Sequence, residues 1–527
     1  MENGRKGCED MLTPAQALEK EWGKIKREWR LAFLTAFLTG LLIHMPAMLS
    51  DIPNHDGLSS IWFDQNMITS GRWFLTVACG FSSFYTVPWV IGILGLFYLG
   101  VTAAALTELL EVRKNWAIVA VSGLLVAFPA ITSTFAYVFT LDGYMLALLL
   151  AVLAVLFTKK YRYGFLPGGF CLALSLGTYQ SYLAFAMILS VFAILMLAME
   201  RTGTAEKVKK GLRYLYMGVL GAVLYYVILQ VLLQLQGKEL DSYQGISGLS
   251  SDAASSAGIF SRIVGMYRDF IGFSLKGNVL LNNWISAAAW ILLVCAALTA
   301  AVFLAVRRKW WKNVWFFVIM VVALLALPLV TNVILFVSPS VTYHLLMRYQ
   351  WVLFPIGIVA FMDRHAGAVR GGAALEWTVF GAAFVLVFFY GVTDNIGYSN
   401  LNRKYEKTYA YCVRLLDRIE QTPGYYQGIP IAMVGVVGDE QFPETDITLP
   451  VTSGMIGING DILLYTGENY RLFIQNYLGA TLNILSAEAM AEMYYDEEYI
   501  GMDSFPGENS IKIIDGVMYI KTENIHR

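Results

Sequence analysis

Long apolar runs separated by short polar segments fill the chain up to residue 394. A membrane-crossing helix needs about 20 consecutive apolar residues, and on that scale the pattern predicts about eleven spans, several of them tilted or only partly inserted. The expected spans cover residues 31–50, 86–106, 116–134, 141–158, 165–178, 180–199, 212–235, 284–306, 314–337, 345–362 and 374–394.

Lysine and arginine side chains occupy every second loop between these spans. Because cationic loops near span ends are retained in the cytosol, residues 1–30 are expected to lie inside the cell. With an odd number of spans, the loop after the first span, the 236–283 loop and the tail then lie outside. The basic loops are those around Arg113, Lys159, Lys207, Arg307 and Arg364.

The segment before the first span predicts an amphipathic helix. Thr13 and Gln16 fit a capping box around Pro14, and an apolar stripe follows among lysines and glutamates, made of Leu18, Trp22, Ile25 and Trp29. This helix is expected either on the cytosolic leaflet or packed on cytosolic loops.

Composition supports a multi-pass protein of the cell membrane and excludes some partners. Hydrophobic residues make up 57% of the 527 residues and charged residues only 15%, which is far from the soluble norm. A formal net charge of −1 without a basic patch excludes a nucleic-acid partner. The five cysteines lack metal-ligand spacing, so neither a zinc site nor a disulfide framework is predicted.

The tail, residues 395–527, predicts a small extracytosolic α/β or α+β domain after the transmembrane domain of residues 31–394. No glycine-rich phosphate loop or nucleophile elbow occurs in its sequence. Its expected elements are helices over Tyr405–Ile419, Asn469–Tyr477 and Ala487–Tyr495, a strand over Ile429–Val437, and a hairpin of Ile511–Ile514 and Val517–Ile520 turning at Asp515 and Gly516.

The candidate chemistry gathers in the first outer loop, Asp51–Trp73. Its charged and titratable residues are Asp51, His55, Asp56, Asp64 and Arg72. An aspartate can take the proton of an acceptor hydroxyl, and Asp56 is the favoured general base, with Asp51 and Asp64 as the other catalytic candidates. Asp56 also fits the N-cap of an interfacial helix that would bury Leu58, Ile61, Trp62 and Ile68.

Further outer-face residues are candidates for substrate binding. Asp142 opens the fourth span, where a carboxylate also stabilises the helix N-terminus. Tyr179 and Gln180 lie in a short polar segment between two spans. Arg348 is an isolated cation that fits either an interfacial anchor or an anion clamp. Within the spans, His44 and Asn332 are expected to hydrogen-bond between helices. The 236–283 loop leads into an interface helix and suits a lid.

These features fit sugar transfer from a lipid-linked donor at the membrane surface. A departing phosphate needs positive charge, which Arg72 and Arg348 are placed to supply, while His55, Asp142, Tyr179 and Gln180 complete the expected binding site. The short cytosolic loops cannot contain a nucleotide-binding domain, so no nucleotide cofactor is expected. Asp51, His55 and Asp56 lack the spacing diagnostic of a metal site, and a divalent cation stays open as a cofactor.

Several motifs resemble the GtrII-type glucosyltransferase family: NHD and GRW after the first span, FAYVFTLDGYMLALLLAVLA around the fourth, GTYQSYLAFA at the sixth, and FPGENSIKIIDGVMYIKT near the end. The resemblance runs from about residue 30 to 522. It implies a GT-C-like membrane fold, an essential acidic residue in the first outer loop, here Asp56 or Asp51, and transfer of glucose or a related sugar from undecaprenyl phosphate to a surface glycan such as O-antigen. The acceptor-facing parts match least, which leaves the glycan open.

Two other classes of function compete with this one. A polysaccharide polymerase or ligase also acts on polyprenyl-linked glycans, but would be expected to carry a large outer loop with several arginines. The 236–283 loop contains only two arginines, Arg262 and Arg268, which disfavours this class. A lipid-linked sugar transporter would be expected to show two similar halves with broken helices at the midplane, and the sequence shows neither.

Overall fold

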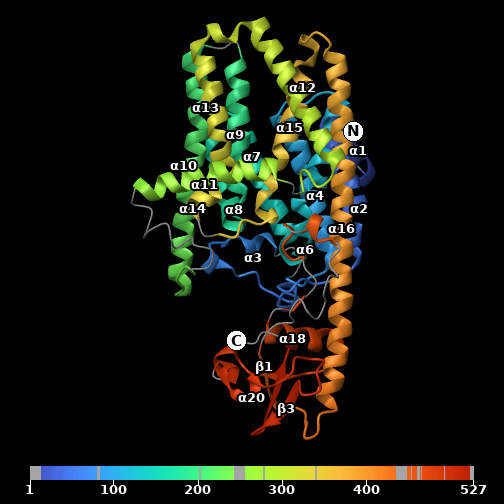
Figure 1. Cartoon of the computed structure of the whole chain (residues 1–527). Coiled ribbons are helices and arrows are strands. Elements are labelled where there is room, and N and C mark those ends of the chain that lie inside the picture. The colour runs from blue at the N-terminus through green and yellow to red at the C-terminus, as the bar shows by residue number, and fades with distance from the viewer. Residues whose placement is uncertain are drawn as a thin grey trace, which may run out of the picture.

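The structure is a computed structural model, and it describes most of the chain. The described residues are 13–79, 84–200, 203–241, 256–276, 279–338, 341–434, 448–452, 454–459, 463–464, 466–491 and 493–522. Within them the chain forms a helical bundle followed by a smaller domain with a β-sheet (Figure 1).

Nine helices of the described chain are long and apolar enough to cross a membrane, and a bent pair makes ten. The nine contain α2 (Arg27–Leu49), α4 (Pro88–Leu109), α7 (Leu141–Lys160), α9 (Tyr182–Met199), α10 (Thr204–Gln236), α12 (Trp284–Arg308), α13 (Val314–Thr331), α15 (Leu353–His365) and α16 (Gly372–Glu420). The predicted span at 165–178 forms α8 (Phe165–Thr178), whose 14 residues reach only about 21 Å. It packs between α7 and α10.

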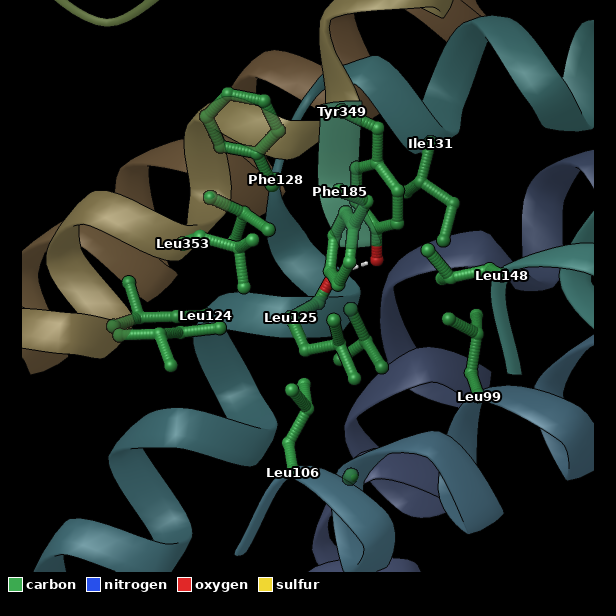
Figure 2. Close-up of a cluster of buried hydrophobic side chains, with 14 of the residues drawn as sticks. Leu99, Leu106, Leu124, Leu125, Phe128, Ile131, Leu148, Phe185, Tyr349 and Leu353 are labelled. Atoms are coloured by element: carbon green, nitrogen blue, oxygen red, sulfur yellow. Dashed lines mark hydrogen bonds between the residues drawn. The ribbon is translucent and has the colours of Figure 1, made fainter. Parts of the chain in front are cut away.

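The bent pair is α5 (Asn115–Ala127) and α6 (Ala130–Ala136), which meet at 47°. Pro129 lies at the bend, and because proline has no N–H, the Leu125 carbonyl loses its helical donor. The Tyr349 hydroxyl donates to that carbonyl instead, inside a cluster of buried apolar side chains (Figure 2). His44 contacts the next carbonyl, that of Val126, at 2.8 Å, and its other ring nitrogen lies 2.7 Å from the Tyr398 hydroxyl. The expected interhelical role of His44 is confirmed.

Several of the predicted basic loops meet at one end of the bundle. Lys26 at the start of α2 and Lys160 at the end of α7 both pair with Glu108. Lys159 and Arg364 share Glu111, at 2.8 and 3.1 Å. These contacts place the ends of α2, α4, α7 and α15 together, as the alternation of charge predicted. The N-terminal helix α1 (Pro14–Lys24) begins with the predicted capping box of Thr13 and Gln16.

The helix α11 (Ser256–Leu275) lies across the bundle axis instead of along it (Figure 1). Its Phe260, Val264, Ile271 and Leu275 are exposed apolar side chains, spaced so that they share one face of the helix. Asn332, at the break between α13 and α14 (Val333–Val337), donates to the Met266 carbonyl at 2.8 Å. Asn332 therefore bonds between helices, as predicted.

The tail is built on a four-stranded sheet in the order β2-β1-β4-β3. Strand β1 (Pro430–Val434) pairs in parallel with β2 (Asn483–Ile484) and β4 (Val517–Lys521), and β3 (Ile511–Ile514) forms the predicted hairpin with β4. The strand predicted over Ile429–Val437 ends at Val434 as far as the structure describes it. The predicted helix over Asn469–Tyr477 forms as α18 (Gly467–Phe473) and a π-helical turn, Ile474–Leu478.

The helix α16 connects the bundle to the tail without a break at residue 395. Its last turns carry Tyr411, Leu415 and Ile419 into the core of the tail. Figure 1 shows the tail at the far end of α16, next to the blue loop that follows α2. The predicted transmembrane and tail regions are thus linked by one continuous helix of 49 residues.

Candidate functional site

The first connecting loop is not the interfacial helix that its apolar spacing predicted. It forms two separate 3₁₀ turns, Gly57–Ser59 and Ile68–Ser70. The four apolar residues do not share a face: Leu58 is buried in the core of the tail, Ile68 packs against α10, and Trp62 is 66% exposed. Tertiary packing at each end of the loop overrides the local periodicity.

The catalytic candidate Asp56 occupies the N-cap position of the Gly57–Ser59 turn, but its side chain makes no capping hydrogen bond, which corrects the second expectation for this loop. The capping bond comes from Asn54, whose Oδ1 accepts from the Gly57 N–H at 2.8 Å, while its Nδ2 donates to the Ala136 carbonyl. Asn54 is fully buried and fixes the turn. The Asp56 carboxylate is thus turned away from the backbone and is 56% exposed, with Oδ2 3.5 Å from the Nε2 atom of His55.

The surroundings of His55 lower its pKa on balance. Burial lowers its pKa most, Asp56 raises it, and the charge of Lys404 lowers it again. Lys404 is a buried residue of α16, and its Nζ donates to the Asn459 carbonyl at 2.8 Å. The pair of His55 and Asp56 therefore lies where the first loop meets the part of α16 that leads into the tail.

The other two carboxylates of the loop have different surroundings. Asp64 is exposed, and its Oδ1 accepts from the Asn66 N–H at 2.9 Å, so it closes its own turn. Asp51 is exposed beside a small cavity that Tyr85 and Tyr477 also line. Of the three carboxylates, Asp56 is the one with a histidine partner in the described chain.

A second group forms where the loop docks on α7 and on the connection between α8 and α9. Arg72 donates to the Tyr144 hydroxyl at 3.1 Å and lies 5.5 Å from the ring centroid of Tyr179, which stacks on Tyr144. Gln180 donates to the Ser70 carbonyl at 3.1 Å and contacts the Tyr225 hydroxyl. The structure therefore brings three predicted residues together, Arg72, Tyr179 and Gln180.

Gly71 makes this docking possible. Its φ of +77° is a left-handed conformation that side chains disfavour. A Cβ atom there would lie 2.5 Å from the Tyr225 hydroxyl and 2.8 Å from Gln180 Nε2. The predicted GRW motif thus holds a turn that only glycine accommodates, next to the guanidinium of Arg72.

Asp142 is fully buried in the protein. It is 0% exposed, lies in the first turn of α7 and accepts from the Gly143 N–H at 2.9 Å. A Cβ added at Gly143 would meet the Cys79 sulfur at 2.5 Å, so the end of α3 (Leu75–Ala78) covers this turn. The position agrees with the predicted stabilisation of a helix N-terminus.

Arg348 is neither a free clamp nor an exposed anchor. It is 8% exposed and donates two hydrogen bonds, at 2.7 and 2.8 Å, to both carboxylate oxygens of Asp269 on α11. Its guanidinium lies 3.8 Å from the ring centroid of Tyr343. The charge of Arg348 is therefore compensated by a residue of the predicted lid segment.

An open groove of about 840 Å³ follows the seam between α2 and α16. From Phe384 to Arg403 it extends about 28 Å along α16 toward the tail. Its walls are apolar. Its end nearest the tail carries Asn395, Ser399 and Arg403, with Arg403 donating to Ser399 Oγ at 3.0 Å. Leu42 and Phe388 are exposed along it at 77% and 59%. Such a surface suits a hydrocarbon chain.

Some of these residues gave no signal in the sequence. Lys404 and Tyr144 lie in helical segments whose periodicity does not distinguish them, and Tyr225 lies in the middle of an apolar span. Asp269 had a signal, because the one carboxylate of an amphipathic, mostly apolar stretch is expected to have a cationic partner.

The fold and the loop together define an integral membrane protein with a polar loop packed between a helical bundle and a smaller domain that contains a β-sheet. The model of the glucosyl transferase GtrII family matches residues 45–355, more than half of the chain, so the chain belongs to this family. The predicted family is confirmed, and the protein is a glycosyltransferase of the membrane. The match includes every candidate residue named above up to Arg348. No curated protein and no solved structure matches the chain.

Proposed function

We propose that the protein transfers glucose or a related sugar from undecaprenyl phosphate to a cell-surface glycan at the outer face of the membrane, with inversion. The observation that carries this proposal is the pair of His55 and Asp56, held by a buried Asn54 turn at the end of the bundle that bears the tail. An exposed carboxylate beside a membrane-embedded helix suits an acceptor arriving from water and a donor arriving in the bilayer.

In the proposed reaction, the acceptor hydroxyl oxygen bonds to C1 of the sugar while the bond from C1 to the phosphate oxygen breaks. The proton of the hydroxyl passes to Asp56, and polyprenyl phosphate leaves with the bonding electron pair. His55, whose Nε2 lies 3.5 Å from Oδ2 of Asp56, would orient the carboxylate toward the acceptor. These roles are assigned to Asp56 because it is the one of the three carboxylates with a histidine partner in the described chain, while Asp64 accepts a hydrogen bond within its own turn.

Arg72 is the proposed first ligand of the leaving phosphate. Tyr144 and Tyr179 hold its guanidinium in place, and a pre-positioned cation stabilises developing charge without reorganisation. Arg348 would contribute only after Asp269 releases it, which assigns the predicted lid role to α11. The groove between α2 and α16 supports a lipid-borne substrate, since it offers an apolar path with a cation at its outer end.

The test uses membranes containing the protein, radiolabelled polyprenyl-phosphate glucose and the glycans of the cell. We expect label to move from the lipid to a glycan with the wild type and to stay in the lipid with Asp56→Asn. A matched control is Glu488→Gln, which removes an exposed carboxylate from the tail far from the loop. Full transfer by correctly inserted Asp56→Asn removes Asp56 from the mechanism, and absence of transfer by the wild type refutes the donor.

A further inference from the structure

A second groove, of about 650 Å³, lies at the end of the bundle opposite to the tail. Its polar lining comes from Arg27 and Arg30 in the first turn of α2 and from Asn115 and Trp116 at the start of α5. Its apolar lining includes Leu34 and further residues of α2, α5 and α16, namely Leu31, Val119 and Phe380. The groove thus changes from cationic to apolar along the direction in which a lipid would lie.

The two arginines differ from their basic neighbours. Lys26, Lys159 and Arg364 each pair with a glutamate at this end of the bundle. In contrast, no ion pair of Arg27 or Arg30 occurs among the described residues, and the contact that Arg30 makes is with the ring of Trp22, 5.6 Å from the centroid. Two neighbouring cations that have no acidic partner in the part of the chain that the structure describes therefore face one groove.

Two N–H donors at the same groove have no partner in the described chain. They are Nε of Arg30 and Nε1 of Trp116, and both atoms are shielded by the protein. A shielded N–H without an acceptor costs free energy, so an acceptor is expected there. The lining supplies donors and positive charge and no carboxylate, which matches an anionic oxygen ligand.

We propose that this groove binds an anionic phospholipid of the leaflet next to α1. Its phosphate would lie at Arg27 and Arg30, within reach of the Trp116 indole, and an acyl chain would follow Leu34 and Phe380 into the bilayer. Trp22 and Trp116 fit this depth, because tryptophan favours the headgroup level. The proposal does not depend on the transferase activity or on which leaflet faces the cytosol.

The experiment measures lipid retention by native mass spectrometry of the detergent-purified full chain after exchange into mixed phosphatidylglycerol and phosphatidylcholine. Each arginine near the membrane surface attracts anionic lipid by about 1 kcal/mol. Removing two should therefore weaken retention of phosphatidylglycerol about 30-fold. We expect this loss in Arg27→Gln/Arg30→Gln, and a smaller one in Trp116→Phe, which keeps the ring and removes the donor.

The control is Arg162→Gln/Lys209→Gln, which removes two exposed cations at the same end of the bundle outside the groove. It should retain phosphatidylglycerol as the wild type does. Equal retention of the two lipids by the wild type, or an equal loss in the control variant, overturns the proposal. Release of the bound lipid by inorganic phosphate at comparable concentration would also overturn it, because the site would then be one for a free anion.

Discussion

Leu58 offers a direct test of the packing between the first loop and the tail. This loop residue is 1% exposed, and the buried residues around it, such as Tyr411, Leu415 and Tyr470, all belong to α16 or the tail. Asn476 of the tail contacts the Leu58 carbonyl at 3.5 Å. The substitution Leu58→Ala therefore removes a side chain on which the tail closes.

The magnitude follows from the three carbon atoms that the substitution deletes. At about 0.8 kcal/mol for each buried carbon, the lost transfer free energy is about 2.4 kcal/mol, and the remaining cavity adds to it. We expect the local free energy of separating loop and tail to fall by about 3 kcal/mol, which is a factor of about 150 in the open population.

The assay is amide hydrogen exchange of the purified protein in detergent, read on the loop, on β1 and on β4. Leu58→Ala should raise exchange in all three, because their protection depends on the same core. The control is Val77→Ala in the same connecting segment, where the side chain is 63% exposed. Unchanged exchange in Leu58→Ala would show that the loop does not pack into the tail.

Three further predictions follow from the site. Gly71→Ala should undock the loop from Tyr225 and Gln180, with a loss of about 1–3 kcal/mol in local stability. Limited proteolysis of the loop measures this loss. The control Gly218→Ala, at a position with open space around it, should have little effect. Asp269→Ala leaves the buried Arg348 without its carboxylate and should lower unfolding stability by about 3 kcal/mol in a thermal-shift assay. Arg268→Ala, at an exposed position of α11, should have little effect. An equal effect of the two substitutions would contradict a stabilising role of the ion pair. Folding lowers the pKa of His55, so the unfolded chain binds more protons than the folded chain just below pH 6.5. The contribution of His55 to the free energy of unfolding therefore falls as the pH drops from 6.5 through the pKa of the folded state. His55→Gln should flatten that part of the stability curve, and an unaltered pH dependence would contradict the assignment.

The sequence predicted the bundle well because apolar length and loop charge act locally. Ten of the eleven expected spans agree with a long helix or with the bent pair, and the pairing of Lys159 and Arg364 with Glu111 places their loops together as expected. The helix predicted at 165–178 forms with those bounds as α8, but its 14 residues are fewer than the roughly 20 that a full crossing needs.

The site was predicted only in part, for a physical reason. Arg72, Tyr179 and Gln180 were named from their polarity, and the structure places them together. The apolar spacing of Leu58 and Ile68 predicted one interfacial helix, and this prediction was wrong because the two residues pack into different cores. Interactions between distant segments leave no periodic trace in either segment. Examples are the ion pair of Arg348 with Asp269 and the electrostatic effect of Lys404 on His55.

The central claim is that the first loop and the tail lie outside the bilayer, on the side where the lipid-linked sugar is presented. It is tested most directly by labelling intact cells with a membrane-impermeant maleimide after placing single cysteines by Asp64→Cys, Glu488→Cys and Glu21→Cys, in a background without reactive native thiols. The three positions are exposed in the loop, in the tail and on α1. We predict that the first two label in intact cells and the third only after permeabilisation. Labelling of the α1 position in intact cells, with the loop and tail protected, would contradict the proposed site of sugar transfer.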